Sequence, residues 1–295
     1  MSFPDYPFTS RHLDRDGIHL HYLDEGPKDA PPLLMLHGNP TWSFFFRKPI
    51  LALRDRYRCI VPDHIGMGLS DKPDDRAYDH VLARRIDDVS ALVEHLQIER
   101  DITLILHDWG GAIGMGYAAR NPQHIARLIL MNTAAFGLPD DQSVPWQLKL
   151  CRTPGLGPLL VRGFNGFCRY ALRHCATHPL APDVAAAYLA PYDNWSNRRA
   201  VLRFVQDIPL RPSHPSHTAL AAITTALDQF RAHPALVCWG MQDFVFNEGF
   251  LEQWQRHLPE AQFHRFPDAG HYLLEDAGEQ VLPLIDQFLS DHPLR

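Results

Sequence analysis

Two patterns of hydrophobic and polar positions alternate along the chain. Short apolar runs, typical of buried strands, are separated by stretches such as 82–96 and 112–120, in which apolar residues recur at helical spacing. Residues 11–26 predict a hairpin, because the Asp-Gly pair at 16–17 favours a tight turn with positive φ. Strands that alternate with helices predict an α/β fold with a mostly parallel, doubly wound sheet. The strands are expected at residues 32–36, 58–62, 103–106, 128–132, 235–239 and 262–266.

The alternation stops between residues 134 and 216, where the sequence becomes helix-like and aromatic, with Pro and Gly between its segments. We therefore expect a helical cap inserted between two strands of the sheet. The cap divides the chain into a first part of the core (1–133), the cap (134–216) and a second part of the core (217–295). Its aromatic residues are expected either to line an apolar cavity for long alkyl chains or to bury the cap against the core: Trp146, Phe164, Phe167, Trp195 and Phe204.

Charge and composition narrow the classes of function. The formal net charge of −6 argues against a surface for nucleic acid, and the short pairs Arg84-Arg85 and Arg198-Arg199 are expected to lie on solvated helix faces. No apolar run is long enough to span a membrane, and the N-terminus lacks the apolar core of a signal peptide. The five cysteines show no C-x-x-C pair, which favours reduced thiols in a cytoplasmic protein over disulfides or a zinc site. No metal or other cofactor is expected.

One junction between a strand and a helix carries a reactive side chain. The apolar run in LILHDWGGAIG breaks at His107–Gly111, and a helix-like stretch follows. A reactive residue beside glycines at such a turn is typical of a nucleophile elbow, which usually holds serine. Serine attack on a saturated carbon would leave a stable ether, whereas a carboxylate leaves an ester that can be resolved. Asp108 at this position therefore predicts attack on a saturated or strained electrophile rather than ordinary ester hydrolysis.

Two further residues follow the elbow in the order nucleophile, acid, histidine. Asp243 comes just after the strand expected at 235–239, and His271 lies between the last strand and the last helix. Alone, an Asp after a strand is usually a turn former, and a histidine is usually a packed or surface residue. Because the strands of an open α/β sheet end at one edge, we expect these residues to meet Asp108 there. Asp243 would then orient His271, and His271 would activate water.

The stretch LLMLHGNPTWSF predicts the donors of the site. The backbone N–H groups of Gly38 and Asn39 follow a strand, where an oxyanion hole is expected. The side-chain amide of Asn39 and the indole N–H of Trp109 are neutral donors, suited to a departing halide or a developing carboxylate oxygen. Packing beneath the cap is the alternative explanation for Trp109.

These motifs resemble a known family. HGNPTWSFFFR, DHIGMGLSDKP, HDWGG and AGHYLLED are similar to the motifs of the haloalkane dehalogenase group of α/β-hydrolases. One subgroup places its acid after the sixth strand, where this chain has Asn132, so the resemblance assigns the acid to Asp243. Fluoroacetate dehalogenases carry Arg after the nucleophile, where this chain has Trp109. NTAAFGLP, LCRTPGLGPLLVRGFNGF and YDNWSNRRAVLRFVQDIPL resemble the branch that includes the β-lactone decarboxylases.

The resemblance implies decarboxylation of cis-3,4-dialkyl β-lactones to cis-alkenes and carbon dioxide in long-chain olefin biosynthesis. It also implies an apolar substrate with alkyl chains and an assembly with upstream β-lactone-forming enzymes. Attack by Asp108 at the saturated ring carbon or at the carbonyl, and the part played by His271, stay open. The alternatives are a haloalkane dehalogenase, a non-catalytic binding protein, and an epoxide hydrolase with Tyr170, Tyr188 or Tyr192 as the lid acid.

Overall fold

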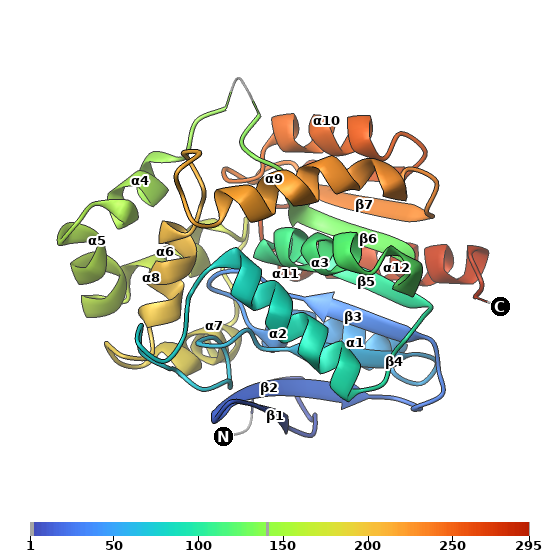
Figure 1. Ribbon diagram of the computed structural model, residues 1–295, viewed down its shortest axis with the longest axis horizontal. Coiled ribbons are helices and arrows are strands. Elements are labelled where there is room, and N and C mark those ends of the chain that lie inside the picture. The colour runs from blue at the N-terminus through green and yellow to red at the C-terminus, as the bar shows by residue number, and fades with distance from the viewer. Residues whose placement is uncertain (1–2, 140–141, 295) are drawn as a thin grey trace.

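An eight-stranded sheet lies at the centre of the computed structural model, which describes residues 3–139 and 142–294 (Figure 1). The strands are β1 Arg11–Arg15, β2 Ile18–Glu25, β3 Pro32–Leu36, β4 Arg58–Pro62, β5 Ile102–Asp108, β6 Ile125–Thr133, β7 Ala235–Gly240 and β8 Gln262–Phe266. Their order is β1-β2-β4-β3-β5-β6-β7-β8. β2 pairs antiparallel with β1 and with β4, and every other neighbour is parallel. The predicted mostly parallel, doubly wound sheet is confirmed.

The predicted strands are present, and the central two are longer than expected. The hairpin turns at Asp16 and Gly17, whose φ values are both positive, at 58° and 83°. β5 continues through the polar residues His107 and Asp108 to pair with the end of β6 at Thr133. Polar residues at a strand end interrupt the apolar pattern in the sequence, although the backbone ladder continues through them. Asp108 is therefore the last residue of a strand rather than part of a loop.

Helices cover both faces of the sheet. α2, α3 and α9 lie on one face, and α1 and α12 lie on the other (Figure 1). α3 begins at Trp109, directly after β5, because the elbow has no intervening loop. No helix in the described ranges is long and apolar enough to cross a membrane. The helices are α1 Arg47–Leu53, α2 Leu82–His95, α3 Trp109–Arg120, α4 Trp146–Arg152, α5 Leu156–Pro158, α6 Gly166–His174, α7 Pro182–Leu189, α8 Arg199–Gln206, α9 His217–Ala226, α10 Glu248–His257, α11 Leu273–Asp276 and α12 Gly278–Asp291.

The helices α4 to α8 lie together beyond one end of the sheet (left in Figure 1). α4 packs against α5 and α8, and α6 packs against α7. A π-helical segment, η3 (Leu159–Gly163), connects α5 to the loop before α6. α9 instead packs against α2 and α3 and so belongs to a helix layer of the sheet. The division of the chain at residues 134 and 216 stays a prediction.

Candidate active site

Asp108 stands at a sharp turn between β5 and α3. Its backbone has φ 52° and ψ −125°, a conformation that side-chain-bearing residues rarely adopt. Glycines allow the helix that follows to approach the sheet closely. A Cβ on Gly110 would lie 1.9 Å from the carbonyl oxygen of Leu36, and one on Gly111 would lie 1.9 Å from Thr133 Oγ1. The elbow therefore holds the Asp108 carboxylate at the carboxyl end of β5.

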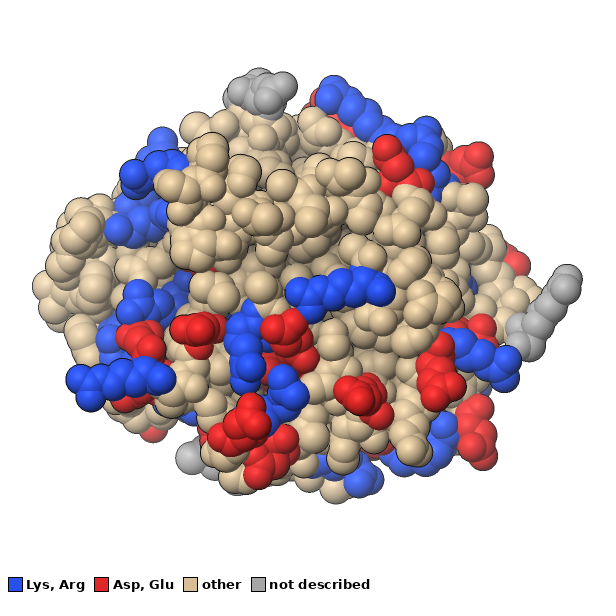
Figure 2. Space-filling view, viewed as in Figure 1, with Lys and Arg blue, Asp and Glu red and all other residues tan. Residues whose placement is uncertain are grey.

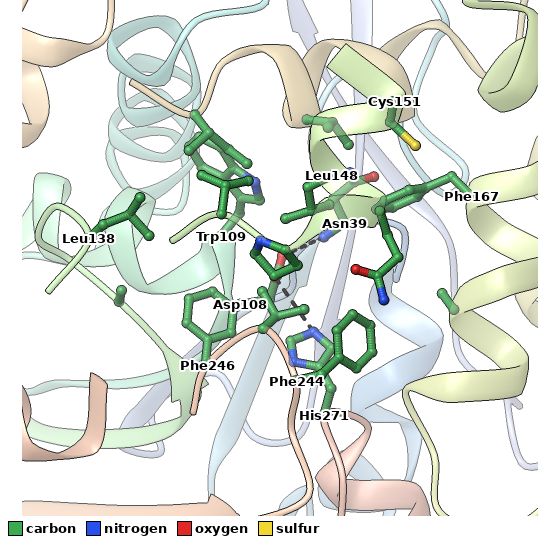
Figure 3. Close-up of a pocket in the computed structure, with 18 of the residues that line it drawn as sticks. Asn39, Asp108, Trp109, Leu138, Leu148, Cys151, Phe167, Phe244, Phe246 and His271 are labelled. Atoms are coloured by element: carbon green, nitrogen blue, oxygen red, sulfur yellow. Dashed lines mark hydrogen bonds and ion pairs between the residues drawn. The ribbon is translucent and has the colours of Figure 1, made fainter. Parts of the chain in front are cut away.

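The structure brings Asp108, Asp243 and His271 together from the ends of three strands. Figure 3 shows Asp108 and His271 side by side. His271 Nδ1 lies 2.7 Å from Asp243 Oδ2. On its other side, His271 Nε2 lies 3.5 Å from Asp108 Oδ2. All three residues are buried. The imidazole thus bridges two carboxylates, the arrangement in which one carboxylate orients a histidine toward a reacting group.

Asn132 and His107 hold Asp243 and His271 in place. Asn132 Nδ2 donates to Asp243 Oδ2 at 3.0 Å, and Asn132 Oδ1 accepts from the N–H of Gly240 at 2.8 Å. The amide thus joins the ends of β6 and β7 and orients the acid. His107 Nε2 lies 2.8 Å from the carbonyl oxygen of His271 and donates to it. The sequence assigned no such part to Asn132 or His107, although both lie within two residues of a strand end.

Burial and charge shift the pKa values of the site. Burial raises the pKa of Asp108, against the charge of His271 and the N–H groups of Asn39 and Trp109. Burial also lowers the pKa of His271, but the charge and hydrogen bond of Asp243, with the charge of Asp108, outweigh burial and raise it above its usual value. The pKa of His107 is lowered well below its usual value by burial and by His271, so His107 is neutral. The site therefore favours an imidazolium between two carboxylates.

The predicted donors at Gly38 and Asn39 are arranged differently from the expectation. The N–H of Gly38 donates to Thr41 Oγ1 at 3.2 Å rather than toward the nucleophile. Gly38 contributes space instead, because a Cβ there would lie 1.8 Å from Asp108 Oδ1. The N–H of Asn39 donates to Asp108 Oδ1 at 2.7 Å, whereas its side-chain amide donates to the carbonyl of Val201 at 3.1 Å. Only the main chain of Asn39 is therefore directed at Asp108.

A cavity of about 330 Å³ lies above Asp108, between the sheet and the cap helices. Its lining is mostly apolar, with Asp108, His271 and Trp109 at its base and residues such as Leu148, Phe167, Phe244 and Phe246 around them (Figure 3). Of the predicted cap aromatics, Trp146 and Phe167 line this cavity. Phe204 is buried and packs against Trp109 at 5.5 Å, while Phe164 and Trp195 lie on the outer surface. The cavity suits an apolar ligand that presents a polar group to Asp108.

Comparison with known proteins places the chain. A family model described as alpha/beta hydrolase fold matches residues 31–278. The chain belongs to the α/β-hydrolase family. It is 49% identical to a cis-3-alkyl-4-alkyloxetan-2-one decarboxylase of Shewanella oneidensis, over 97% of this chain and 89% of the relative. A decarboxylase of the same name from Xanthomonas campestris pv. campestris is 46% identical over the whole of both chains.

Among solved structures, the haloalkane dehalogenase DbeA from Bradyrhizobium elkani superposes with a TM-score of 0.86 and 28% identity, over 96% of this chain and 99% of that one. The predicted fold class is thereby confirmed. So is the resemblance to the decarboxylase branch, because the two decarboxylases match at much higher identity than DbeA.

In this α/β-hydrolase, the expectation that Arg85 lies on a solvated helix face is wrong. Only 1% of Arg85 is exposed. Its Nη1 donates to Asp207 Oδ2 at 2.5 Å, and its guanidinium lies 3.8 Å from the ring centre of Phe204. Asp207 also accepts from Ser216 Oγ at 2.5 Å. The ion pair joins α2 to the end of α8, behind Trp109. Asp207 lies too far along the chain from Arg85 for the local pattern to reveal this contact.

The three candidate lid acids occupy different places. Tyr188 donates to Glu275 Oε1 at 2.6 Å, and Tyr192 donates to the carbonyl of Thr41 at 3.3 Å, both outside the cavity lining. Tyr170 lines the cavity and accepts from Gln147 at 2.9 Å. An epoxide hydrolase of this fold would thus have one tyrosine available at the cavity. Across the described residues, no cluster of His, Cys, Asp and Glu could hold a metal ion.

Proposed function

We propose that this α/β-hydrolase converts cis-3,4-dialkyl β-lactones into cis-alkenes and carbon dioxide, with Asp108, Asp243 and His271 as its reacting and orienting groups. One observation carries the proposal: a buried carboxylate, not a hydroxyl, stands on the elbow at the base of an apolar cavity. The identities of 49% and 46% to named oxetan-2-one decarboxylases select the lactone among strained electrophiles.

The first step opens the ring. Asp108 Oδ1 is held by the N–H of Asn39, which leaves Oδ2 free to attack. Oδ2 forms a bond to the saturated ring carbon that bears the ring oxygen, and the bond between that carbon and the ring oxygen breaks. The products are an alkyl ester of Asp108 and a free carboxylate on the neighbouring carbon. Release of ring strain favours this step, and the N–H of Asn39 supports the ester carbonyl that forms from Oδ1.

The second step is an elimination. The bond between the neighbouring carbon and the carboxylate breaks to release carbon dioxide, and its electron pair forms the double bond as Asp108 departs. Attack inverts the first carbon, so an anti elimination converts a cis-lactone into a cis-alkene. Atoms and electrons balance without water or a co-reactant.

His271 then acts through its charge. The imidazolium that the two carboxylates favour lies 3.5 Å from Asp108 Oδ2 and stabilises the carboxylate as it leaves. Asp243 keeps the ring oriented and its charge balanced. The competing route, attack at the lactone carbonyl to give a mixed anhydride, places the same groups in the same positions but forms an acyl adduct instead of an alkyl one.

The haloalkane alternative is weaker on the identities: 28% to the haloalkane dehalogenase DbeA, against 49% and 46% to the two oxetan-2-one decarboxylases. The donors suit either reaction. One N–H of the Asn39 amide donates to the carbonyl of Val201 in the cap, and its second N–H and the Trp109 indole can serve a halide or a developing carboxylate oxygen.

Product analysis tests the proposal. Wild type and Asp108→Asn are incubated with a cis-β-lactone and with a 1-bromoalkane of similar chain length. We expect the wild type to form cis-alkene and carbon dioxide from the lactone with little bromide release, and the Asn variant to form neither product. Brisk bromide release without alkene would establish the dehalogenase instead.

We also propose that the protein works in the cytoplasm beside enzymes that form its lactone. Its five cysteines are all free and buried, as expected where thiols stay reduced. A β-lactone is reactive, so transfer from a neighbouring enzyme would limit its hydrolysis. Retention of these enzymes with the tagged protein during gentle purification from its native host tests this association.

A further inference from the structure

Exposed hydrophobic side chains are confined to one part of the molecule. Within the described residues, every large hydrophobic side chain that is exposed lies between 138 and 210, and the rest of the fold has none. Four of them, Leu156, Leu159, Phe164 and Trp195, lie outside the cavity lining. Phe164 and Trp195 are 65% and 47% exposed. Aromatic side chains this exposed are unusual on a surface that contacts only water.

These four residues form one surface, called here the apolar cap face. α5 runs directly into η3, so Leu156 and Leu159 are close in the chain. A Cβ on Gly163 would lie 3.3 Å from Leu159 and 3.7 Å from Trp195, so both side chains flank that glycine. Figure 2 shows the end of the molecule that carries α4 and α5 as largely uncharged, with Lys and Arg side chains beside it.

The cap segment that carries the apolar cap face has a net charge opposite to that of the whole chain. Residues 134–216 contain nine Lys and Arg and five Asp, a net charge of +4 in a chain of net −6. Lys149, Arg169 and Arg173 are exposed. Arg162 lies 4.4 Å from the ring centre of Trp195, so one cation stands directly on the apolar surface. Two such faces would repel each other, which disfavours a second copy of the chain as the occupant.

The cavity opens beside the same face. Leu138, Trp146, Leu150 and Leu210 line the cavity that contains Asp108 and are also exposed on the surface. An apolar path thus runs from the nucleophile to the outside of the cap. Ligands that enter or leave along it meet hydrophobic surface rather than water.

We infer that the apolar cap face docks on an anionic lipid surface, with the mouth of the cavity at the membrane. Exposed Trp, Phe and Leu enter the boundary between headgroups and acyl chains, and nearby Lys and Arg pair with anionic headgroups. A molecule with two alkyl chains then passes between cavity and bilayer without crossing water. The docking step goes beyond the proposed reaction and holds whatever chemistry Asp108 performs.

Vesicle flotation tests this inference with the full chain and no substrate. The probes are vesicles of phosphatidylcholine alone and of equal parts phosphatidylcholine and phosphatidylglycerol. We expect flotation with the second and at least tenfold weaker binding to the first or at high salt. The same flotation by Asp108→Asn would separate docking from catalysis.

Three variants locate the contact. The triple variant Leu159→Gln/Phe164→Gln/Trp195→Gln should lose at least tenfold in vesicle affinity while its melting temperature and its turnover of a short-chain lactone stay near wild type. Arg169→Gln/Arg173→Gln should lose about fivefold in vesicle affinity per charge removed. The control Arg100→Gln/Arg256→Gln removes the same charge from exposed residues outside the cap and should lose far less vesicle affinity.

Flotation that is absent from wild type, or unchanged in the triple variant, overturns the inference. So does a triple variant that turns an oligomer into a monomer while wild type ignores vesicles, because the face would then bind a second copy.

Discussion

Replacement of Gly38 by alanine tests how tightly the site is built around Asp108. The added Cβ would lie 1.8 Å from Asp108 Oδ1 and 2.3 Å from its Cβ and Cγ. Rotation of the Asp108 side chain cannot easily relieve contacts this short, because Asp108 stands at a strained elbow and its Oδ1 accepts a hydrogen bond from the N–H of Asn39. The carboxylate must rotate or the two loops must separate.

The expected cost can be set for both activity and stability. Overpacking of this kind destabilises a fold by about 1–3 kcal/mol. Displacement of a reacting group by about 1 Å lowers turnover on the order of 100-fold. We therefore expect Gly38→Ala to keep its fold with a modestly lower melting temperature and to lose roughly 100-fold or more in kcat for alkene formation.

A matched variant exists in the same cavity. Gly137 also lines it, but a Cβ there would meet nothing within 4 Å. Gly137→Ala should therefore stay within about threefold of wild type in kcat, because no group near Asp108 moves. Thermal melts and steady-state kinetics of both variants provide the measurement. Near-normal turnover by Gly38→Ala would refute the packing argument, since the carboxylate would then tolerate a shift that we regard as disabling.

Three further predictions follow from the contacts around the site. Asn132→Ala removes the 3.0 Å hydrogen bond to Asp243 and should lower kcat about 10-fold and shift its pH profile, as measured by steady-state kinetics. An unchanged profile would mean that the N–H of Val245, 2.7 Å from Asp243 Oδ1, is enough to orient Asp243. Asp207→Asn leaves the buried Arg85 without its ion-pair partner and should lower the free energy of unfolding by about 3–5 kcal/mol, or the melting temperature by roughly 5–10 °C. The double variant Asp207→Leu/Arg85→Met should recover much of this stability; equal losses in the single and the double variant would argue against an unpaired buried charge as the cause. The pKa of Asp108 is raised, so activity should fall with decreasing pH at values above the usual carboxyl range; the pKa of His271 is also raised, so an imidazolium requirement predicts an alkaline limb above the usual imidazole value. A rate that rises through that limb would indicate a neutral histidine base.

Local pattern predicted the sheet and the meeting of Asp108, Asp243 and His271 because both depend on order along the chain. Strand ends, glycines beside Asp108 and a histidine after the last strand are all visible as short stretches. Their meeting point then follows from the rule that parallel strands end at one edge of a sheet.

The sequence did not reveal contacts between distant segments. One N–H of the Asn39 amide donates to the carbonyl of Val201, and Arg85 pairs with Asp207, which lies 122 residues away. No local pattern reveals either partner. The surroundings of the cap aromatics could not be predicted either. Their side chains face the cavity, the core or water according to how the short cap helices pack, so Phe204 is buried and Phe164 is exposed.

In the proposed reaction, Asp108 opens the lactone and leaves by elimination, without water. The most direct test is turnover of a cis-β-lactone in water labelled with heavy oxygen, followed by mass analysis of the peptide that contains Asp108. We expect cis-alkene and carbon dioxide from wild type, neither product from Asp108→Asn, and no heavy oxygen in the Asp108 peptide after many turnovers. Heavy oxygen in that carboxylate together with a β-hydroxy acid, or alkene formation by the Asn variant, would contradict it.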